Sequence, residues 1–547
     1  MSIPSSPQSS DPLPLFVHLG FAGARRLLKA EEHPAVDPAA FETEVENWLE
    51  QRLQSLRDDL HLQPHHRLCG VSALAAGADT IFARACETLD IPLRVFLPQT
   101  RNEFLHARGE RSPDFTEQQR EESSRLLDAP HVIQERLVSD AADRHERFKD
   151  TNREIVRVSD LLLCVLSKDQ AAYPGGTWDL VQRASHRGKR VLKVTVDVVD
   201  GKPAFAEEWV EPGPPDPATH DPADDEPFPP VLPHTLRHAS LKPADSNVSL
   251  AKSYIQTVKQ VGSETANRLR RKFKRLAIIV VAAHVAATVL ATIALAAAGM
   301  HAVPILLALE LALLLSGLIA HQKLHTSHIL RNWAEARLLA EIGRSMSAFA
   351  NLHLYPEHLF KLPFPRSVRS ILRALTVFHL QSTKRDAGPW ETKRDAYLFE
   401  RLEKPRGGQI DYYGNRENKA AKEFALIHRL FKWLWIIAFV ATTTKLIIHL
   451  FIHIDEPGEA ILNGVLGTLA IVTPVLAAGS LSFGAALDLE ARMVTYRDMV
   501  KYLKRQKRHL QDASSERDFA HLVLETETVI LGETANWFAR RSVTGIS

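Results

Sequence analysis

Two glycine turns, each directly after an apolar stretch, are the parts of this chain best suited to holding a phosphate group. They are Gly-Phe-Ala-Gly at 20–23 and Tyr-Pro-Gly-Gly-Thr at 173–177. Glycine lets backbone N–H groups approach an anion closely, and a helix that starts there offers the positive end of its dipole. Thr177 adds a hydroxyl and Arg25 adds a charged donor. The same glycines also fit tight turns that bind nothing, which any such sheet needs.

The elements around these turns predict an α/β domain. Apolar runs predict strands, and apolar residues at helical spacing predict helices. The predicted strands are 15–23, the start of 67–79, 92–98, 160–167 and 189–196, and the predicted helices are 39–60, 80–89 and 178–187. Strands that alternate with helices indicate a Rossmann-like parallel sheet over 15–202. Ligands of such sheets bind beyond the carboxyl ends of the strands, and the charged segment 101–155 is expected to be helical and to cover that cleft.

The order of these motifs resembles the SLOG superfamily. Its members are Rossmann-like nucleotide-binding domains related to the lonely-guy phosphoribohydrolases, the DNA-processing protein DprA and the amino-terminal domain of TRPM channels. The resemblance covers about 15–200 and rests on GFAGAR (20–25), SALAAGADTIFARA (72–85), PLRVFLP (92–98), SDLLLCVL (159–166) and PGGTWDLVQRA (174–184). It implies a pocket for a nucleotide or an ADP-ribose-like ligand. The residues that it implies for this pocket are Gly20, Gly23, Arg25, Ser72, Gly77, Asp79, Gly175, Gly176, Thr177 and Asp179.

The second glycine turn departs from the hydrolases of that superfamily. Their turn reads PGGxGT with a following Glu, whereas here Thr177 follows Gly176 directly and Trp178 and Asp179 come next. This departure favours sensing of a nucleotide over its hydrolysis, so no catalytic residue is assigned. Asp179 could still act as a carboxylate base near a ribose. A membrane-anchored, phosphoribohydrolase-like enzyme therefore stays open as the alternative.

Four long apolar runs in the second half predict an all-helical membrane domain. The predicted spans are 276–299, 302–320, 433–454 and 460–487. Each is near or above the roughly 20 residues that cross a bilayer core. Lys and Arg flank these runs on one side, and the short loops within each pair lie on the other. By the positive-inside rule, both termini and the segment 321–431 are expected in the cytoplasm of a multi-pass protein of the inner membrane.

Four ionisable residues fall inside the predicted spans, namely His284, Glu310, Lys445 and His449. Such groups are costly in lipid unless they are paired or hydrated, so they are candidates for function as well as for structural polar contacts. Glu310 and Lys445 lie about 12 Å deep from the same membrane surface, at 1.5 Å per residue. They are expected to pair within or between protomers. The alternative is that each faces a water-filled lumen alone.

The membrane half is similar to the SLATT group, two-span membrane effectors that occur with SLOG domains and nucleotide-signal synthases. The similarity covers about 250–547 and rests on a basic helix before the spans, WAEARLLAEIGRS (333–345), QIDYYGNRENKA (409–420) and HLVLETETVILGETANWFARR (521–541). We interpret it as a duplication with units 248–385 and 386–547. It implies a homo-oligomeric, pore-forming or membrane-perturbing effector in bacterial anti-phage defence. A ligand-gated channel outside defence stays open.

Composition excludes several other kinds of site. The chain has 67 Lys and Arg against 65 Asp and Glu, so its charge does not favour a nucleic acid as partner. Its three cysteines, Cys69, Cys86 and Cys164, are too far apart for a thiolate zinc site, and no metal is expected. Residues 1–14 are predicted to be a disordered lead-in. The segment 203–247, which has nine prolines between Pro212 and Pro233, is predicted to be an extended linker.

Overall fold

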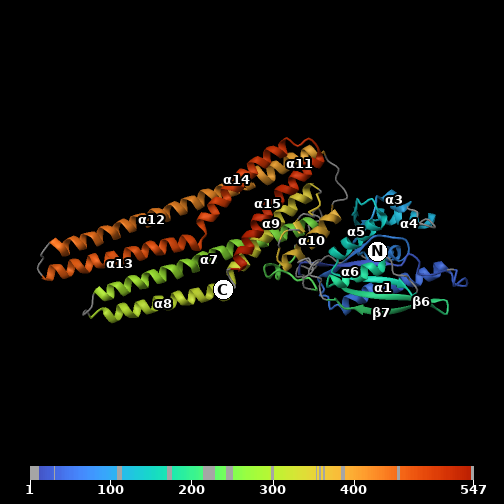
Figure 1. Ribbon diagram of the computed structural model, residues 1–547, viewed down its shortest axis with the longest axis horizontal. Coiled ribbons are helices and arrows are strands. Elements are labelled where there is room, and N and C mark those ends of the chain that lie inside the picture. The colour runs from blue at the N-terminus through green and yellow to red at the C-terminus, as the bar shows by residue number, and fades with distance from the viewer. Residues whose placement is uncertain are drawn as a thin grey trace. The chain divides into compact units, whose positions relative to one another are not determined.

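The chain folds as two units that interleave in sequence. The computed structural model describes residues 12–29, 31–106, 114–168, 175–213, 228–241, 250–296, 301–352, 354–356, 359–360, 362, 364–382, 389–451 and 456–543. The first unit combines Met1–Val258 with Tyr355–Asp386, and the second combines Lys259–Leu354 with Ala387–Ser547. The chain therefore passes from one unit to the other three times. Figure 1 labels the elements along the chain.

The first unit is built on a seven-stranded sheet in the order β4-β3-β2-β1-β5-β6-β7. Its strands are β1 (Leu15–Gly23), β2 (His66–Ser72), β3 (Leu93–Leu97), β4 (Val132–Leu137), β5 (Leu161–Ser167), β6 (Arg190–Val199) and β7 (Lys202–Val210). All neighbouring strands are parallel except β7, which runs antiparallel to β6. The strand order reverses between β1 and β5. The predicted Rossmann-like fold is confirmed.

Helices cover both faces of this sheet. They are α1 (Pro38–Asp59), α2 (Ala78–Thr88), α3 (Arg101–Leu105), α4 (Glu117–Asp128), α5 (Arg144–Val158) and α6 (Thr177–His186). Apolar residues of α1, α2 and α4 share one core cluster with Leu161, Leu163 and Val165 of β5. Those of α5 and α6 share the other with Leu162 and Cys164. Because β5 is buried on both faces, its sequence is continuously apolar, which made it easy to predict.

The sheet has two strands that the sequence did not predict, β4 and β7. β4 lies in the segment 101–155 that was expected to be helical, and β7 occupies Lys202–Val210, where the linker was expected to begin at 203. Both are edge strands that carry several charges; only Val132 and Ile133 of β4 are buried, and no residue of β7 is. Charged edge strands of this kind resist unwanted pairing, but they dilute the apolar signal.

Parts of the two segments predicted to lack structure also pack in the first unit. Of the lead-in 1–14, residues 12–14 are described: Leu13 is buried, and the carbonyl oxygen of Pro14 accepts a hydrogen bond of 2.9 Å from Tyr254. In the linker, the carbonyl of Pro230 bonds His66 Nε2 at 2.8 Å, and a short 3₁₀ helix, η1 (His234–Leu236), follows. The stretches 1–11, 214–227 and 242–249 lie outside the described residues.

The helix α10 (Arg366–Ser382) belongs to the sheet unit, although the sequence placed it in the first membrane unit, 248–385. It contacts β1 and β4, and the ring of Phe378 packs edge-on against Phe16 with centroids 5.2 Å apart. The ring of Tyr254, from α7 (Leu250–Ala296), lies 4.8 Å from Phe378. α10 thus completes the sheet domain from a distant part of the sequence.

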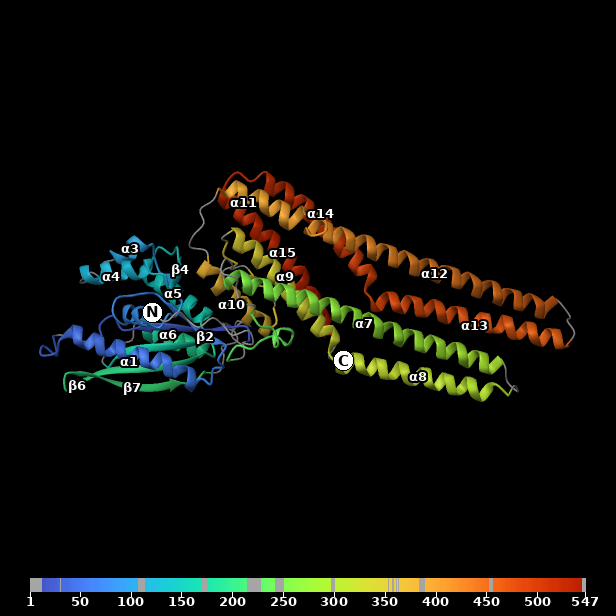
Figure 2. The same cartoon turned by 180° about the vertical axis from the view of Figure 1, so that it is seen from behind.

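The second unit is entirely helical in its described parts. Its further elements are α8 (Val303–Thr326), α9 (Ile329–Leu352), α11 (Trp390–Tyr397), the π-helix η4 (Leu398–Glu403), α12 (Gln409–Phe451), α13 (Glu456–Ala486), α14 (Leu489–Gln511) and α15 (Glu516–Val543). α7 and α8 lie side by side as one hairpin, and α12 and α13 as another, in both views (Figures 1 and 2). Four helical stretches are long and apolar enough to cross a membrane.

These four candidate spans match the predicted ones in number and place. They are Leu250–Leu295, Val303–Thr326, Gln409–Leu450 and Gly464–Gln511. Their large apolar side chains face outward, as Leu311 at 68% exposed and Leu450 at 61% illustrate. Such a surface requires lipid or further protein around it, which identifies a membrane protein.

Candidate functional site

The two glycine motifs meet at the carboxyl edge of the sheet, where the strand order reverses between β1 and β5. The predicted turn at 20–23 is wrong, because these residues are the end of strand β1. Gly77, just before α2, has φ +92°, and a Cβ added there would lie 2.4 Å from the carbonyl oxygen of Arg25. Just inside α6, Thr177 Oγ donates a hydrogen bond of 3.1 Å to the carbonyl of Gly23, the last residue of β1. The amino ends of α2 and α6 therefore both abut the end of β1. This crevice is where doubly wound sheets bind ligands.

Asp79 holds the ends of β1 and β2 together. Its Oδ1 accepts from the Gly23 amide at 2.8 Å, and its Oδ2 accepts from Ser72 Oγ at 3.1 Å and from the Ala75 amide at 3.3 Å. Burial raises the pKa of Asp79 to about 6, although these hydrogen bonds oppose the rise. The structure brings Ser72, Asp79 and Gly23 together, with the carboxylate bonded to the protein. We therefore assign Asp79 the role of a positioning residue that holds the ends of β1 and β2 in place.

The start of α6 presents uncapped N–H groups. Its N-cap residue is Gly176, which has no side chain to accept from them, and the Thr177 and Trp178 amides bond to no other described residue. The Gly176 carbonyl accepts from Asn152 Nδ2 at 3.3 Å, which fixes the turn against α5. Free N–H groups at the positive end of a helix dipole form a site for an anion. Residues 169–174, which include Pro174 of the predicted turn, lie outside the described residues.

Arg25 and Arg144 stand beside this helix start. Both pair with the carboxylate of Asp114, and Arg25 Nη1 lies 2.9 Å from Asp114 Oδ1. Both guanidinium groups lie over the ring of Phe148, at 5.5 and 5.6 Å from its centroid. A Cβ added to Gly175 would lie 3.3 Å from the Cβ of Phe148, so this ring connects the arginines to the glycine turn. Two adjacent guanidinium groups, each 35% exposed, suit a phosphate group.

Sequence reasoning missed Arg144, Phe148, Asn152 and Asp114. The first three are spaced four residues apart on α5, so they share one face of that helix. This spacing was the available signal, because the charged segment 101–155 was already expected to cover the cleft. The start of α6, which this face of α5 contacts through Asn152, lies more than twenty residues further along the sequence. Spacing alone could not show which helix face met the turn.

Two of the residues predicted for nucleotide binding, Gly20 and Asp179, make contacts within the protein that explain them without a ligand. Gly20 lies inside β1, paired with Val71 and Leu162, and three residues before Gly23 it is about 10 Å from the strand end. A Cβ there would lie 2.4 Å from Ser159 Oγ, so close packing explains this glycine. Asp179, in the first turn of α6, accepts from Arg183 Nε at 2.8 Å. Its carboxylate is thus engaged by a cation on its own helix.

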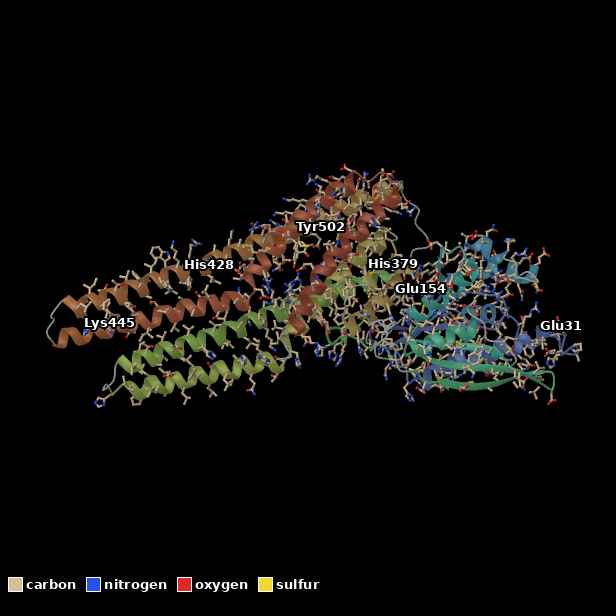
Figure 3. The ribbon with its side chains drawn as sticks, in the orientation of Figure 1. Glu31, Glu154, His379, His428, Lys445 and Tyr502 are labelled. Carbon is tan, nitrogen blue, oxygen red and sulfur yellow. The ribbon has the colours of Figure 1, made fainter. Side chains whose placement is uncertain are left out.

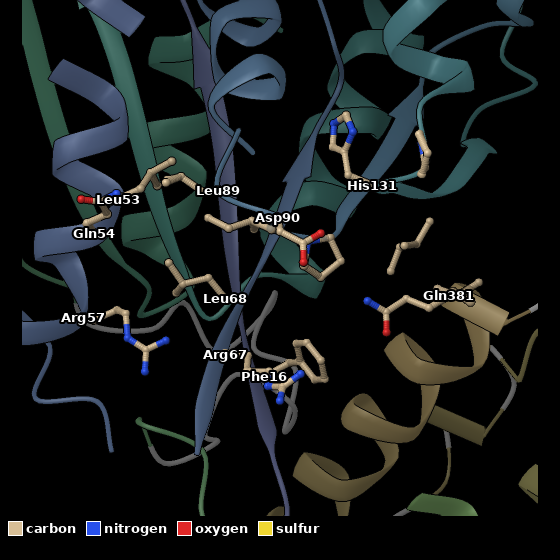
Figure 4. A pocket seen from close by; sticks show the side chains of 15 residues that line it. Phe16, Leu53, Gln54, Arg57, Arg67, Leu68, Leu89, Asp90, His131 and Gln381 are labelled. Carbon is tan, nitrogen blue, oxygen red and sulfur yellow. The ribbon is translucent and has the colours of Figure 1, made fainter. Parts of the chain in front are cut away.

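A cavity of about 500 Å³ opens at the opposite, amino-terminal edge of the sheet (Figure 4). Its wall includes Arg67 and Pro92, next to the starts of β2 and β3, and Gln381 near the end of α10. None of the residues predicted for nucleotide binding lines it. We place the candidate site at the carboxyl edge because the starts of α2 and α6 and the Arg25–Arg144 pair lie there. The cavity at the amino-terminal edge is also lined by two arginines, Arg57 and Arg67, but no helix start in the described chain lines it.

The intramembrane polar residues do not form one cluster. His284 Nδ1 bonds the carbonyl of Val280, one turn earlier in α7, at 2.7 Å. Glu310 and Lys445 form no salt bridge with each other in the described chain, and Lys445 is exposed on α12 (Figure 3). His449 is exposed as well. Pairing of Glu310 with Lys445 within one chain is thus not seen, and pairing between protomers stays a prediction.

Known proteins offer no guide to this site. Neither a scan of protein-family models nor searches of curated proteins and of solved structures find a match to the chain.

Acidification should change the stability of the first unit through two buried groups, whose effects on the free energy of unfolding have opposite signs. Burial lowers the pKa of His18 from 6.5 to about 4, so the unfolded chain binds more protons and stability is lost as pH falls from 6.5 to 4. The pKa of Asp79 is raised from 3.8 to about 6, so the folded chain binds more protons and stability is gained as pH falls from 6 to 3.8. Each effect is on the order of 3 kcal/mol at 1.4 kcal/mol per pKa unit.

We expect single variants to unmask these effects in thermal unfolding of the full-length protein in detergent between pH 6.5 and 4. His18→Gln should gain stability on acidification relative to wild type, and Asp79→Asn should lose it, by roughly 6–10 °C in Tm. The quantity compared is the change of Tm with pH within each variant. A variant whose Tm is already lower than that of wild type at pH 6.5 therefore does not confound the comparison. Equal pH slopes in both variants and wild type would contradict the assignment.

Proposed function

We propose that this chain is a membrane-bound, nucleotide-sensing effector. The first unit would bind a nucleotide-derived small molecule, with an ADP-ribose-like ligand as one possibility, at the carboxyl edge of its sheet. The helical second unit would respond by forming a pore or perturbing the bilayer. The observation that carries the proposal is the meeting of the α6 start, the glycine motifs and the Arg25–Arg144 pair at the strand-order reversal.

The connections between the units support coupling. α7 is a single helix whose first residues belong to the sheet unit and whose later residues form the first candidate span. The chain then returns to the sheet unit through α10 before it enters α11 and α12. A change at the sheet could therefore reach both pairs of spans through the backbone itself. By the SLATT resemblance, we propose a homo-oligomer in the bacterial inner membrane that acts in anti-phage defence.

The alternative is a nucleotide-processing enzyme that its spans merely localise. It needs a carboxylate base, and the nearest candidate from the sequence, Asp179, is bonded to Arg183 and 3.5 Å from Asn152 Nδ2. Both contacts fall on the same oxygen, Oδ2, which is therefore occupied by donors of the protein itself. These contacts favour the sensor, and measured turnover would favour the enzyme.

Binding to the full-length protein in detergent tests the site, with ADP-ribose, ATP and cyclic AMP as calorimetric probes. For the ligand that binds, Gly176→Val should lower affinity at least tenfold, or about 1.4 kcal/mol, because a branched side chain would crowd the uncapped N–H groups. Arg25→Ala should act in the same direction. Arg125→Ala is the matched control, because that arginine pairs with Glu87 away from the turns. Unchanged affinity in Gly176→Val would remove the turn from the site, and release of product would replace the sensor by an enzyme.

We also propose that both termini lie in the cytoplasm, on the basis of the flanking charges. A cysteine at Glu456, the first residue of α13, should react in intact cells with a membrane-impermeant thiol reagent. A cysteine at Gly407, before α12, should react only after the cells are opened. The native Cys69, Cys86 and Cys164 are all buried and should give little background. Labelling of position 407 in intact cells would reverse the proposed orientation.

A further inference from the structure

A second cavity, of about 270 Å³, lies among the helices of the second unit. Its wall draws on α7, α9, α12, α14 and α15, so both span pairs contribute through their adjoining helices. Arg270 of this wall lies six residues before Leu276, where the first apolar run begins, or about 9 Å along the helix. Arg492 lies five residues after Leu487, where the fourth predicted span ends, or about 8 Å. The cavity is therefore at the level of the lipid headgroups.

The wall of this cavity is strongly basic. Its carboxylates are only Glu341 and Glu423, and its cations are Arg270, Arg337, Arg344, Arg416, Lys419 and Arg492. Both carboxylates are already engaged, since Glu341 pairs with Arg344 and Arg401, and Glu423 lies 3.7 Å from Lys274. Arg270 of α7 and Arg416 of α12 form no salt bridge with any carboxylate in the described chain. Half-buried like charges that face one cavity repel each other unless an anion lies between them.

Aromatic rings hold some of these guanidinium groups in place. The Arg416 group lies 5.2 Å from the ring centroid of Tyr412, and the Arg492 group lies 5.8 Å from that of Trp333. Stacking on a ring fixes the orientation of a guanidinium group and of its N–H donors. These donors match the spacing of two oxygens of a phosphate group. The small volume suits one phosphate with a short substituent better than a dinucleotide.

We propose that this cavity binds a phosphorylated anion, held between Arg270 and Arg416. The anion is either the headgroup of an anionic phospholipid or a free phosphate compound. Because α7 and α12 lead into different span pairs and α14 follows the last span, the bound anion joins the cytoplasmic ends of both hairpins. Anion binding thereby stabilises the arrangement in which those ends are together. This inference does not depend on the nucleotide site.

Thermal unfolding of the detergent-solubilised full-length protein tests the site. The probes are phosphatidylglycerol, phosphatidylcholine and inorganic pyrophosphate, with sodium sulfate to match ionic strength. We expect Tm to rise by about 5 °C with phosphatidylglycerol if the source is lipid, or with pyrophosphate if it is soluble, and to be unchanged by phosphatidylcholine. The double variant Arg270→Gln with Arg416→Gln should lose most of that rise. Its own Tm without any anion should equal or exceed that of wild type, because the repulsion is gone.

The matched control is Arg268→Gln with Arg271→Gln, which removes the same charge from exposed positions of the same helix. This control should keep the rise, which separates the cavity from general attraction of a basic surface to anionic lipid. The single variant Arg270→Lys keeps the charge without the fork and should give an intermediate rise, even if the double variant does not fold. Absence of any rise with both anions, or equal losses in the double variant and the control, would overturn the proposal.

Discussion

Replacing Arg401 with methionine should destabilise the helical unit by about 3–5 kcal/mol, the usual result of breaking a buried ion pair from one side. Arg401, in the π-helix η4, donates to Glu527 through Nε at 2.8 Å and Nη2 at 2.7 Å, and its Nη2 also lies 2.9 Å from Glu341 Oε1. The side chain of Glu527 is fully buried, and Arg401 is its salt-bridge partner within the described chain. Without Arg401, a buried carboxylate would have no cation.

The surrounding hydrogen bonds make this site a junction of five helical elements, η4, α9, α11, α12 and α15. Glu527 of α15 also accepts from Tyr397 Oη at 2.8 Å and from Ser345 Oγ of α9 at 2.6 Å. Gln409, the first residue of α12, donates to Glu341 at 3.2 Å. Burial would raise the pKa of Glu341, but Arg344 and Arg401 together lower it to about 2. The network therefore depends on its cations to keep Glu341 charged and to satisfy the hydrogen-bonding capacity of both carboxylates.

Unfolding in detergent, followed by tryptophan fluorescence, measures this effect. Arg401→Met should lower Tm by roughly 10 °C. Arg344→Met is the matched control, because Arg344 also pairs with Glu341 but is 34% exposed, so its loss should have a much smaller effect. Adding Glu527→Gln to Arg401→Met should recover part of the loss, because residue 527 is then neutral and Glu341 still pairs with Arg344. Equal effects of Arg401→Met and Arg344→Met would contradict the argument.

This network shows why part of the fold could not be predicted from the sequence. Glu341, Arg401 and Glu527 each lie in a helix with many other charges, where a charged residue normally faces solvent. Their burial depends on partners 60 to 126 residues away in sequence. No local pattern encodes such a distance. The same reason explains α10, whose amphipathic sequence predicts a helix but not the surface on which it packs.

Local sequence patterns predicted the structure correctly where burial or contact with lipid requires apolar residues along a whole segment. β5 is apolar at each of its first six positions because both of its faces are covered, and the four spans are apolar because they face outward. Gly77 and Gly175, two glycines named from the sequence, both have a positive φ, which glycine adopts without strain. The contacts of Asp79 and the packing of Gly20 were not accessible, because each depends on the register of neighbouring strands.

Replacing Arg373 with methionine should detach α10 from the sheet, again with a loss of about 3–5 kcal/mol. Arg373 pairs with Asp160, which lies just before β5, and both side chains are nearly buried at 9% and 8% exposed. Although burial opposes it, the Arg373 guanidinium and His18 hold the pKa of Asp160 well below its usual range. In the wild-type protein His18 is not a second cation at pH 7, because burial lowers its pKa to about 4.

The loss should appear as a lower Tm of the full-length protein and as faster proteolysis of the connections on either side of α10. Arg366→Met, the same change at an exposed position in the first turn of α10, should have little effect on either measurement. Adding Asp160→Asn to Arg373→Met should restore part of the stability, since the buried carboxylate is then neutral. A fragment that ends at residue 258 keeps all seven strands but lacks α10, so it exposes Phe16 and Asp160 and should aggregate. A soluble, monomeric fragment 1–258 would show that α10 is dispensable to the sheet, and the predicted loss for Arg373→Met would then be wrong.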